Sequence, residues 1–204
     1  MMTTNQGFFL LKSRLTKAVQ QEILAAARSV VIQAPLFRPT MANGQSFNYS
    51  MTNCGELGWV ADRHGYRYQQ VHPETLSRFP AMPQVIRDLA INLAKETGND
   101  NFDPESCLIN LYRKGEKLGM HQDNTEKNLS APIISISLGD SGVFVLGGFL
   151  RTDETKHYIV QSGDIIVMSG ESRNFFHSFK GTVPNTSNLL KDGGRLNLTI
   201  RQVN

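Results

Sequence analysis

The sequence has few cysteines, no long apolar run and no targeting segment, and each shortage excludes a class of protein. Only two cysteines occur among 204 residues, Cys54 and Cys107, and they form no Cys-x-x-Cys pair, which excludes a disulfide framework and a thiolate zinc site. The longest apolar runs, such as residues 8–11, fall far short of the roughly 20 residues that cross a membrane. The N-terminus lacks the basic start and long apolar stretch of a signal peptide. We therefore expect a cytoplasmic protein without a membrane partner.

Charge of one sign is also scarce, because the formal net charge at pH 7 is only +3. Residues 1–100 contain ten Lys and Arg against seven Asp and Glu, whereas residues 101–204 contain eleven of each kind. The whole excess therefore lies in the first half. It permits a phosphate-contacting surface there, although an ordinary solvated surface explains so small an excess more simply. With 40% hydrophobic residues, the chain is globular and long enough for one sizeable core.

The first hundred residues predict two helices on either side of an irregular stretch. Aliphatic residues recur at spacings of three and four over residues 15–33 and again over residues 82–96, which predicts an amphipathic helix in each range. Residues 36–80 are rich in Asn, Gly, Ser, Tyr and Arg without sustained periodicity, and residues 65–68 are typical of a short hairpin. A stretch of this kind is either a functional lid or a loose surface loop.

After Pro104 the pattern changes to short β-rich runs separated by turn residues. The expected strands cover residues 107–112, 133–138, 143–146, 158–160, 164–168, 174–179 and 196–202. Short strands at this spacing indicate an antiparallel sandwich or jelly roll, not a parallel sheet. We expect an α+β fold in which residues 1–104 form helices and a lid packed on a jelly-roll core over residues 105–204, as a single compact unit.

The first candidate site is a histidine and carboxylate pattern. His121-x-Asp123 follows a predicted strand, and His177 lies in a later apolar run. Because side chains alternate along an extended segment, His121 and Asp123 point to the same side, and a distant strand can supply the second imidazole. Two imidazoles and one carboxylate leave open positions on the metal, as in non-haem Fe(II) oxygenases. His72-x-Glu74 has the same spacing, so the pattern alone also fits unrelated surface residues.

The second candidate site is the closing segment 195–201, which alternates strictly between polar and aliphatic residues. Arg195, Asn197, Thr199 and Arg201 share one face, and the aliphatic face predicts a core contact. Two guanidiniums on an inner strand face require anionic partners, because an unpaired buried charge is costly. Two planar guanidinium groups on either side of an Asn suit a small dicarboxylate, because each can donate two hydrogen bonds to a carboxylate. Taken alone, the segment also fits an exposed strand face paired with nearby acids.

Together, the two patterns resemble the AlkB family of Fe(II)- and 2-oxoglutarate-dependent dioxygenases, in its bacterial nucleic-acid repair branch. The resemblance covers roughly residues 50–203. It includes further segments, among them Met-Thr-Asn-Cys-Gly at 51–55, Gly-Trp at 58–59, Gly-Tyr-Arg-Tyr at 65–68 and Ser-Gly-Glu-Ser-Arg at 169–173. It implies a double-stranded β-helix core with N-terminal helices and an irregular nucleotide-recognition lid.

The resemblance implies a role for each candidate residue. The set that would bind Fe(II) is His121, Asp123 and His177. The set that would bind the co-substrate 2-oxoglutarate is Asn110, Tyr112, Arg195, Asn197 and Arg201. The set that would contact the substrate is Trp59, Tyr66, Thr125 and, as our candidate for a phosphate contact, Arg151. No side chain beyond the metal centre is needed as acid or base.

The resemblance also implies the reaction. With O2, the protein would oxidatively demethylate bases such as 1-methyladenine and 3-methylcytosine, and would release formaldehyde, succinate and CO2. The expected partner is single-stranded or damaged DNA, with RNA as a further candidate, and the expected oligomeric state is a monomer. One position departs from the family: Thr125 stands two residues after Asp123, where repair enzymes carry an acidic residue that can meet the charge of the alkylated base. This leaves the preferred lesion open.

Two other readings of the sequence differ in function. The first is a related 2-oxoglutarate oxygenase that acts on tRNA, a protein or a small molecule, with the same iron and co-substrate chemistry under a different lid. The second is a jelly-roll binding module without catalysis. A binding module has no need of the complete set of metal and co-substrate side chains, which favours the enzyme.

Overall fold

The structure is a computed structural model of the chain, and it describes residues 2–3, 6–41 and 43–204. Its helices are α1 (Lys17–Gln33) and α2 (Gln84–Glu96), with a short 3-10 helix at Gly170–Asn174. Its strands are β1 (Met2–Thr3), β2 (Phe8–Leu11), β3 (Ser50–Gly55), β4 (Gly58–Asp62), β5 (Gly65–Gln69), β6 (Ser106–Tyr112), β7 (Leu118–His121), β8 (Ile133–Gly139), β9 (Ser141–Leu146), β10 (Lys156–Val160), β11 (Ile165–Met168), β12 (His177–Val183) and β13 (Arg195–Arg201).

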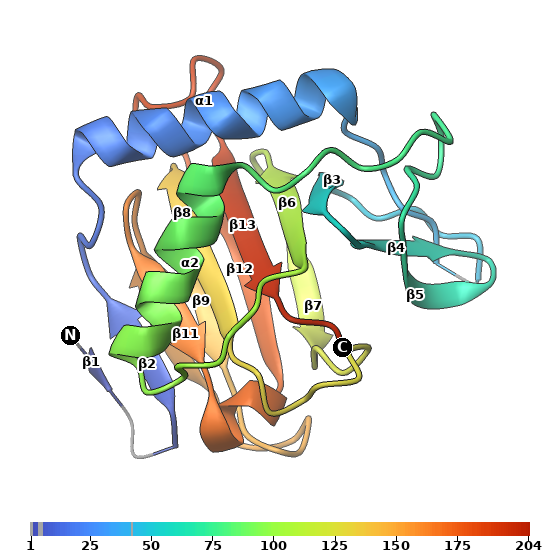
Figure 1. The fold of residues 1–204 in the computed structure, drawn as a ribbon. Helices are drawn as coiled ribbons and strands as arrows, with labels where there is room; N and C mark the ends of the chain where they lie inside the picture. The colour runs from blue at the N-terminus through green and yellow to red at the C-terminus, as the bar shows by residue number, and fades with distance from the viewer. Residues whose placement is uncertain (1, 4–5, 42) are drawn as a thin grey trace.

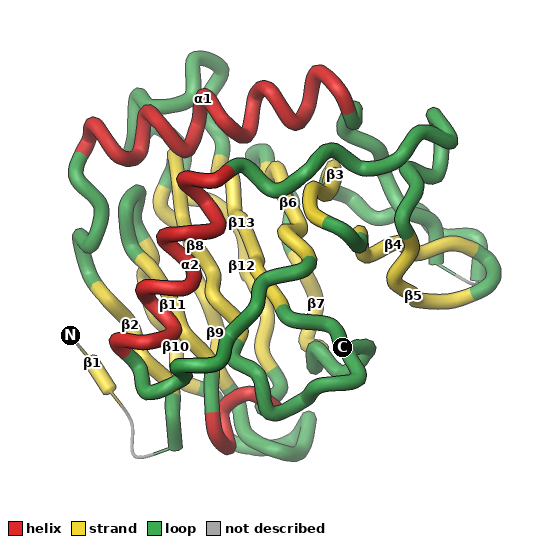
Figure 2. The backbone as a smooth tube through the Cα atoms, viewed as in Figure 1, coloured by secondary structure: helices red, strands yellow, loops and turns green. Residues whose placement is uncertain are grey.

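Two antiparallel sheets make up the core. The larger sheet has the order β1-β2-β11-β8-β13-β6-β3, and the smaller has the order β10-β9-β12-β7. Both helices lie on one side of the larger sheet, and the β4–β5 hairpin projects to one side of the molecule (Figure 1). Long loops surround that hairpin (Figure 2). The predicted α+β fold with a jelly-roll core is confirmed.

Both helices form where the spacing predicts them, because each presents one apolar stripe to the sheet. Helix α1 begins after Thr16, whose side chain accepts a hydrogen bond from the Val19 amide at 3.3 Å, and its buried stripe includes Ile23 and Val30. Helix α2 begins directly after Pro83 and buries Ile86, Ala90, Leu93 and Ala94. These stripes rest on one face of the larger sheet.

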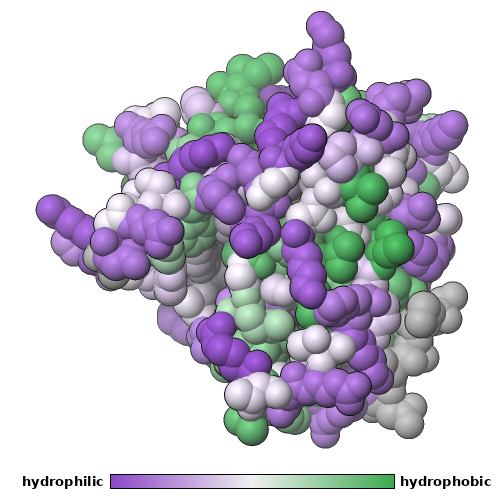
Figure 3. Space-filling model, turned by 180° about the vertical axis from the view of Figure 1, so that it is seen from behind, coloured by the Kyte–Doolittle hydropathy of each residue, from purple (hydrophilic) through white to green (hydrophobic). Residues whose placement is uncertain are grey.

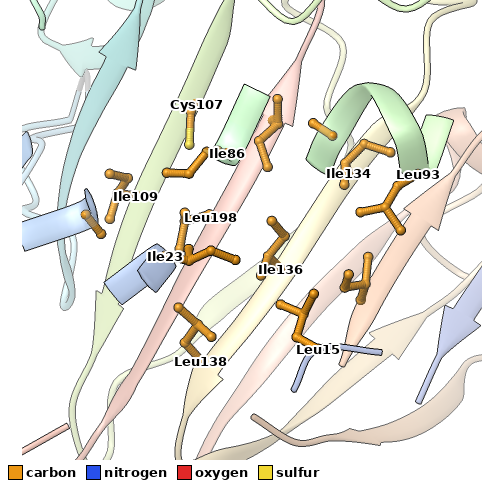
Figure 4. Close-up of a cluster of buried hydrophobic side chains, with 14 of the residues drawn as sticks. Leu15, Ile23, Ile86, Leu93, Cys107, Ile109, Ile134, Ile136, Leu138 and Leu198 are labelled. Carbon is orange, nitrogen blue, oxygen red and sulfur yellow. The ribbon is translucent and has the colours of Figure 1, made fainter. Parts of the chain in front are cut away.

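The main core lies between that sheet and the helices. Alternation along β13 and β6 turns their aliphatic side chains toward the helices, where Leu198 and Ile109 meet Ile23 and Ile86 (Figure 4). Cys54 and Cys107 stand opposite each other on β3 and β6, and both are buried free thiols. Since one face of β13 is committed to this core, its polar residues face the space between the two sheets.

Strands β2 and β3 differ from the prediction. Strand β2 is a short apolar run without alternation because both its faces are covered. Strand β3 looks like a loop in sequence because Thr52 and Asn53 are polar. In the structure, Thr52 Oγ1 donates to the Ala34 carbonyl at 2.9 Å, and the Asn53 side-chain amide donates to the Trp59 carbonyl and accepts from the Trp59 backbone amide. The larger sheet thus takes strands from both sides of residue 104. The division of the chain at that residue stays a prediction.

The side away from the helices has a mixed surface, with hydrophilic side chains around separate hydrophobic patches (Figure 3). Large apolar side chains that face solvent include Phe149, Leu150 and Ile159. Scattered exposed apolar groups of this kind are normal on a globular protein. Within the described part of the chain, no helix combines the length and the apolar character needed to cross a bilayer.

Candidate active site

A cavity of about 220 Å³ lies between the two sheets and opens beneath the β4–β5 hairpin. The polar face of β13 and the matching face of β6 form its floor, and β7 and β12 supply the opposite wall. Its lining includes all but one of the predicted site residues, namely Trp59, Tyr66, Asn110, Tyr112, His121, Asp123, Thr125, His177, Arg195, Asn197 and Arg201. Arg151 lies outside this lining.

Three of these residues form a group that could hold one metal ion. His121 ends β7 and His177 begins β12, and the two are direct cross-strand partners in the smaller sheet. Asp123 follows in the loop after β7. The Nε2 atom of each imidazole lies 3.7 Å from a carboxylate oxygen of Asp123, and the three ligand atoms lie within 4.8 Å of one another. One ion can therefore contact all three side chains.

The hydrogen bonds of both imidazoles engage Nδ1 and leave Nε2 to bind a metal. His121 Nδ1 lies 2.8 Å from the Gly119 carbonyl and His177 Nδ1 lies 3.0 Å from the Phe175 carbonyl, so each Nδ1 carries the proton and each Nε2 presents a lone pair. Burial lowers the pKa of His177 to about 4, and the neighbouring His121 adds to this shift. His177 is therefore neutral at physiological pH, as a metal ligand must be.

Asp123 is held as a carboxylate. Although burial opposes its ionisation, Arg201 and the two imidazoles keep the pKa of its carboxyl well below the usual range. Arg201 Nη2 donates to Asp123 Oδ2 at 2.7 Å, and Arg173 Nη1 donates to the Asp123 carbonyl at 2.5 Å. These contacts orient the carboxylate toward the histidines.

Glu126 completes a buried ionic network behind the metal group. Its carboxylate pairs with Arg173 at 3.1 Å and with Arg201 at 3.3 Å, and it accepts a hydrogen bond from the Tyr68 hydroxyl at 2.5 Å. Both oxygens are thus engaged away from the cavity. Glu126 therefore does not replace the acidic residue that is absent at Thr125.

Arg195 lies at the opposite end of the floor without a carboxylate partner. Its guanidinium donates to Ser137 Oγ at 2.9 Å and lies 4.5 Å above the Phe179 ring centroid. Its Nε atom has no hydrogen-bond partner among the described residues, and burial lowers its pKa to about 10. A buried cation with free donors in a cavity fits the carboxylate of a small ligand.

The middle of the floor is set by strand register. Asn197 on β13 pairs with Asn110 on β6, and Arg195 pairs with Tyr112, so the four predicted side chains are cross-strand neighbours. Asn110 Oδ1 is buried without a partner among the described residues, whereas the Asn197 amide donates to Ser135 Oγ at 2.8 Å and to the Ile136 carbonyl at 3.0 Å. The unmatched donor on Arg195 fits a carboxylate oxygen of a small ligand, whereas the unmatched Asn110 Oδ1 can only accept a hydrogen bond.

Aromatic side chains form the rim of the cavity. Trp59 on β4 and Tyr66 on β5 stack with ring centroids 5.4 Å apart and an interplanar angle of 20°. Phe47 lies 6.2 Å from the Trp59 ring and also lines the cavity. Thr125 faces the same space, so the position that departs from the family is placed at the rim.

Arg151 sits beside the cavity instead of within it. Its guanidinium lies 4.9 Å above the Phe176 ring centroid and donates to the Met120 carbonyl at 2.5 Å. Met120 and Phe176 directly precede the two histidine ligands in sequence. Arg151 is therefore an exposed cation near the mouth of the site, with donors left for another partner.

The competing pair at His72 is structural. His72 is buried, its Nε2 lies 2.8 Å from the Pro35 carbonyl, and its Nδ1 accepts from the Glu74 and Thr75 amides, each at 3.2 Å. Both ring nitrogens thus hold the surrounding loop, and neither is left for a metal.

Three residues of the buried network were missed by the sequence argument as site residues: Tyr68, Glu126 and Arg173. Arg173 and Tyr68 lie inside segments that carry the family resemblance, but segment membership gives no direction for a side chain. Glu126 follows Thr125, and a lone acidic residue in a loop is normally solvated. Only the folded arrangement shows that all three lie behind the Asp123 carboxylate.

Comparisons with known proteins agree with this geometry. The sequence pattern described as the 2OG-Fe(II) oxygenase superfamily matches residues 7–201. An alpha-ketoglutarate-dependent dioxygenase AlkB homolog of Caulobacter vibrioides is 39% identical over 98% of this chain and 90% of its own length. The alpha-ketoglutarate-dependent dioxygenase AlkB of Escherichia coli is 39% identical over 96% of this chain and 90% of its own. The solved structure of OsALKBH1 superposes with a TM-score of 0.82 at 28% identity, over 98% of this chain and all of the other.

The jelly roll, the open group of two histidines and one aspartate, and the cationic floor define an oxygenase that uses Fe(II), 2-oxoglutarate and O2. Within that class, the chain belongs to the AlkB family. The predicted cofactors are confirmed by this membership, and so is the predicted enzyme, an Fe(II)- and 2-oxoglutarate-dependent dioxygenase of the nucleic-acid alkylation-repair type.

Proposed function

We propose that this dioxygenase repairs DNA by oxidative demethylation of 1-methyladenine and 3-methylcytosine, and that it works as a monomer in the cytoplasm. The main observation in support is that one cavity of about 220 Å³ is lined by the candidate metal ligands, by Arg195 with its unpaired donor and by the stacked Trp59–Tyr66 pair. A metal group alone would support many oxygenases. The aromatic rim favours a flat substrate.

The residues on the floor would divide the work. His121, Asp123 and His177 would bind Fe(II), which with 2-oxoglutarate and O2 supplies the oxidising power. Arg195 would pair with the distal carboxylate of 2-oxoglutarate, and Arg201 would lie near the carboxylate beside the keto group. Asn110, Tyr112 and Asn197 would complete the co-substrate site between them.

The rim would bind the base. Stacking of a base on an aromatic ring contributes about 1–3 kcal/mol, and the Trp59–Tyr66 pair offers such a surface at the cavity mouth. A methyl group on the Watson–Crick edge weakens base pairing, which lowers the cost of extruding the damaged base. We therefore favour single-stranded or damaged DNA over intact duplex, with RNA as a second substrate to be tested.

Two contacts would tune this binding. Arg151, beside both ligand strands, would pair with a backbone phosphate of the substrate. Thr125 would face the base with a hydroxyl, which can form a hydrogen bond but cannot balance a positive charge. Cationic lesions would therefore be less strongly preferred than in a relative with an acid there.

The test is incubation in air with Fe(II), 2-oxoglutarate and single-stranded DNA or RNA oligonucleotides that contain one methylated base. Formaldehyde release and the mass of the oligonucleotide report demethylation. We expect turnover on DNA, and a loss of more than about 100-fold in His121→Ala, because a lost metal ligand costs at least as much as a lost second-sphere contact. The exposed His157 gives a matched control, and His157→Ala should retain activity.

The alternatives predict other results. Consumption of 2-oxoglutarate without demethylation of any oligonucleotide would point to an oxygenase with a protein or small-molecule substrate. Demethylation of RNA alone would move the substrate to RNA. If folded, metal-loaded protein consumes no 2-oxoglutarate, the proposal is wrong, and a binding module becomes the better reading.

A further inference from the structure

Tyr68 occupies a position between the two parts of the site. It lies on β5, two residues after Tyr66, so both side chains share one face of the hairpin, and it stands directly opposite Trp59 on β4. Trp59 and Tyr66 line the cavity. The Tyr68 hydroxyl instead reaches past the cavity to the buried network.

The contacts of that hydroxyl form a continuous chain to the metal group. It donates to Glu126 Oε1 at 2.5 Å and accepts from Arg201 Nη1 at 3.3 Å. Arg201 in turn donates to Asp123 Oδ2 at 2.7 Å. One side chain therefore separates the Tyr68 hydroxyl from the iron carboxylate.

This arrangement joins an exposed hairpin to a buried cation. The other face of the hairpin is braced within itself, because Arg67 forms a bidentate pair with Asp62 at 2.7 and 2.9 Å. Glu126 is fully buried, and its remaining contacts go to Arg173 and Arg201. A displacement of Arg201 would therefore alter the hydrogen bonds of Tyr68, which shares a face of the hairpin with Trp59 and Tyr66.

We propose that Tyr68 is a positioning residue that couples occupancy of the 2-oxoglutarate site to the geometry of the base-binding hairpin. Arg201 donates to Asp123 and Tyr68, and a co-substrate carboxylate beside it would compete for the same donors. The inference rests on the proposed roles of Arg201 and of the Trp59–Tyr66 pair. The coupling is reciprocal, so base binding changes the affinity for 2-oxoglutarate by the same factor as 2-oxoglutarate changes the affinity for the base.

The chain offers an internal probe, because Trp59 is its single tryptophan and lies on the hairpin itself. The protein is loaded with Mn(II) in place of Fe(II), so that no turnover occurs, and Trp59 emission is recorded while 2-oxoglutarate is added. Calorimetry measures 2-oxoglutarate binding in the same samples. We expect the emission to change in the wild type. In Tyr68→Phe, which removes only the hydroxyl, 2-oxoglutarate should still bind but most of the emission change should be lost.

A second measurement follows the coupling from the other ligand. We expect saturating 2-oxoglutarate to change the affinity for a methylated oligonucleotide by roughly 5-fold or more in the wild type and by less than about 2-fold in Tyr68→Phe. Tyr158→Phe is the matched control, since this tyrosine lies on β10 and packs against Phe8 on β2, whereas β5 belongs to a separate two-stranded sheet. It should behave as the wild type in both measurements.

Glu126→Gln tests the same bridge from its other end, should Tyr68→Phe fail to fold. It keeps the side-chain shape and weakens the ionic part of the network, and we expect it to reduce the emission change. A Tyr68→Phe protein that responds as the wild type does, or a wild type whose emission ignores bound 2-oxoglutarate, would overturn the inference. Failure of the proposed function gives a different result: the wild type would not demethylate any oligonucleotide, whether or not 2-oxoglutarate changes the Trp59 emission.

Discussion

The floor and the rim of the cavity are built in different ways. The floor consists of strands paired on both sides, and its arginines, Arg195 and Arg201, are only 3% and 4% exposed. The rim consists of a two-stranded hairpin and loops, and Tyr66 on it is 54% exposed. Strand register therefore fixes the positions of the candidate metal and co-substrate residues, whereas the candidate substrate contacts lie on short exposed segments. Changes in the two regions should differ in size and in kind.

The largest effects should come from the floor and should separate its two arginines. Arg195→Met removes a buried charge without an ion pair, so we expect 2-oxoglutarate binding to weaken by at least about 100-fold while the free energy of unfolding stays equal or rises. Arg201→Met leaves the Asp123 carboxylate without its arginine partner and removes one of the two ion pairs of Glu126, so it should destabilise the protein by about 3–5 kcal/mol. Calorimetry with Mn(II) protein and urea denaturation measure both quantities. Equal stability losses in the two variants would contradict this contrast.

The next effect concerns pH in metal-free protein. The pKa of His177 lies at about 4 in the folded protein and near 6.5 when unfolded, so between these values the unfolded chain binds a proton that the folded chain does not. Stability should therefore fall as pH decreases from 6.5 to 4, by up to about 3 kcal/mol. Urea denaturation at several pH values measures this loss. In His177→Gln the loss over this window should be smaller.

A smaller effect is expected at the edge of the rim. Arg151→Glu should weaken binding of single-stranded oligonucleotides and lower the slope of log K against log salt by about 1, because one phosphate contact is lost. Fluorescence anisotropy at several salt concentrations measures the slope. Binding of 2-oxoglutarate should not change, and an unaltered salt slope would remove Arg151 from the interface.

The smallest effect should lie within the rim. Thr125→Asp restores a negative charge at the cavity mouth, so we expect the turnover ratio of 3-methylcytosine to the uncharged 1-methylguanine to rise by roughly 2- to 5-fold, the size of an exposed ion pair. Mass spectrometry of a mixed substrate pool measures the ratio directly. Thr125→Asn is the matched neutral control, and it should leave the ratio near the wild-type value.

The contrast between the floor and the rim also explains which elements the sequence could predict. Periodicity locates α1, α2 and β13, because each presents one face to a large core. Alternation also places the four polar residues of β13 on one cavity face. Strand β3 escapes prediction because its buried Thr52 and Asn53 satisfy their hydrogen bonds with distant backbone groups, a condition that local composition does not reveal.

Some residues of the candidate site could likewise be predicted from the sequence, and others could not. The metal group could be predicted because only a few residue types bind iron and the family motif gives their order. The contacts of Tyr68 could not be predicted. Tyr66 and Tyr68 share a strand face, yet Tyr66 lines the cavity whereas the Tyr68 hydroxyl bonds Glu126. The role of Arg173 could not be predicted either, because this residue lies in a 3-10 turn between the strands predicted at residues 164–168 and 174–179.

The two-sided packing of β13 also bears on how this enzyme can change over generations. Deleting one residue within the strand would exchange its faces, placing arginines among the aliphatic side chains under the helices and leucines beneath the iron. Length changes are therefore barred from the strand that carries the proposed co-substrate residues. The loops around β4 and β5 have no such constraint, since surface connections accept insertions readily. New substrate ranges can thus arise by lengthening or shortening those loops, while the oxidising centre keeps its register.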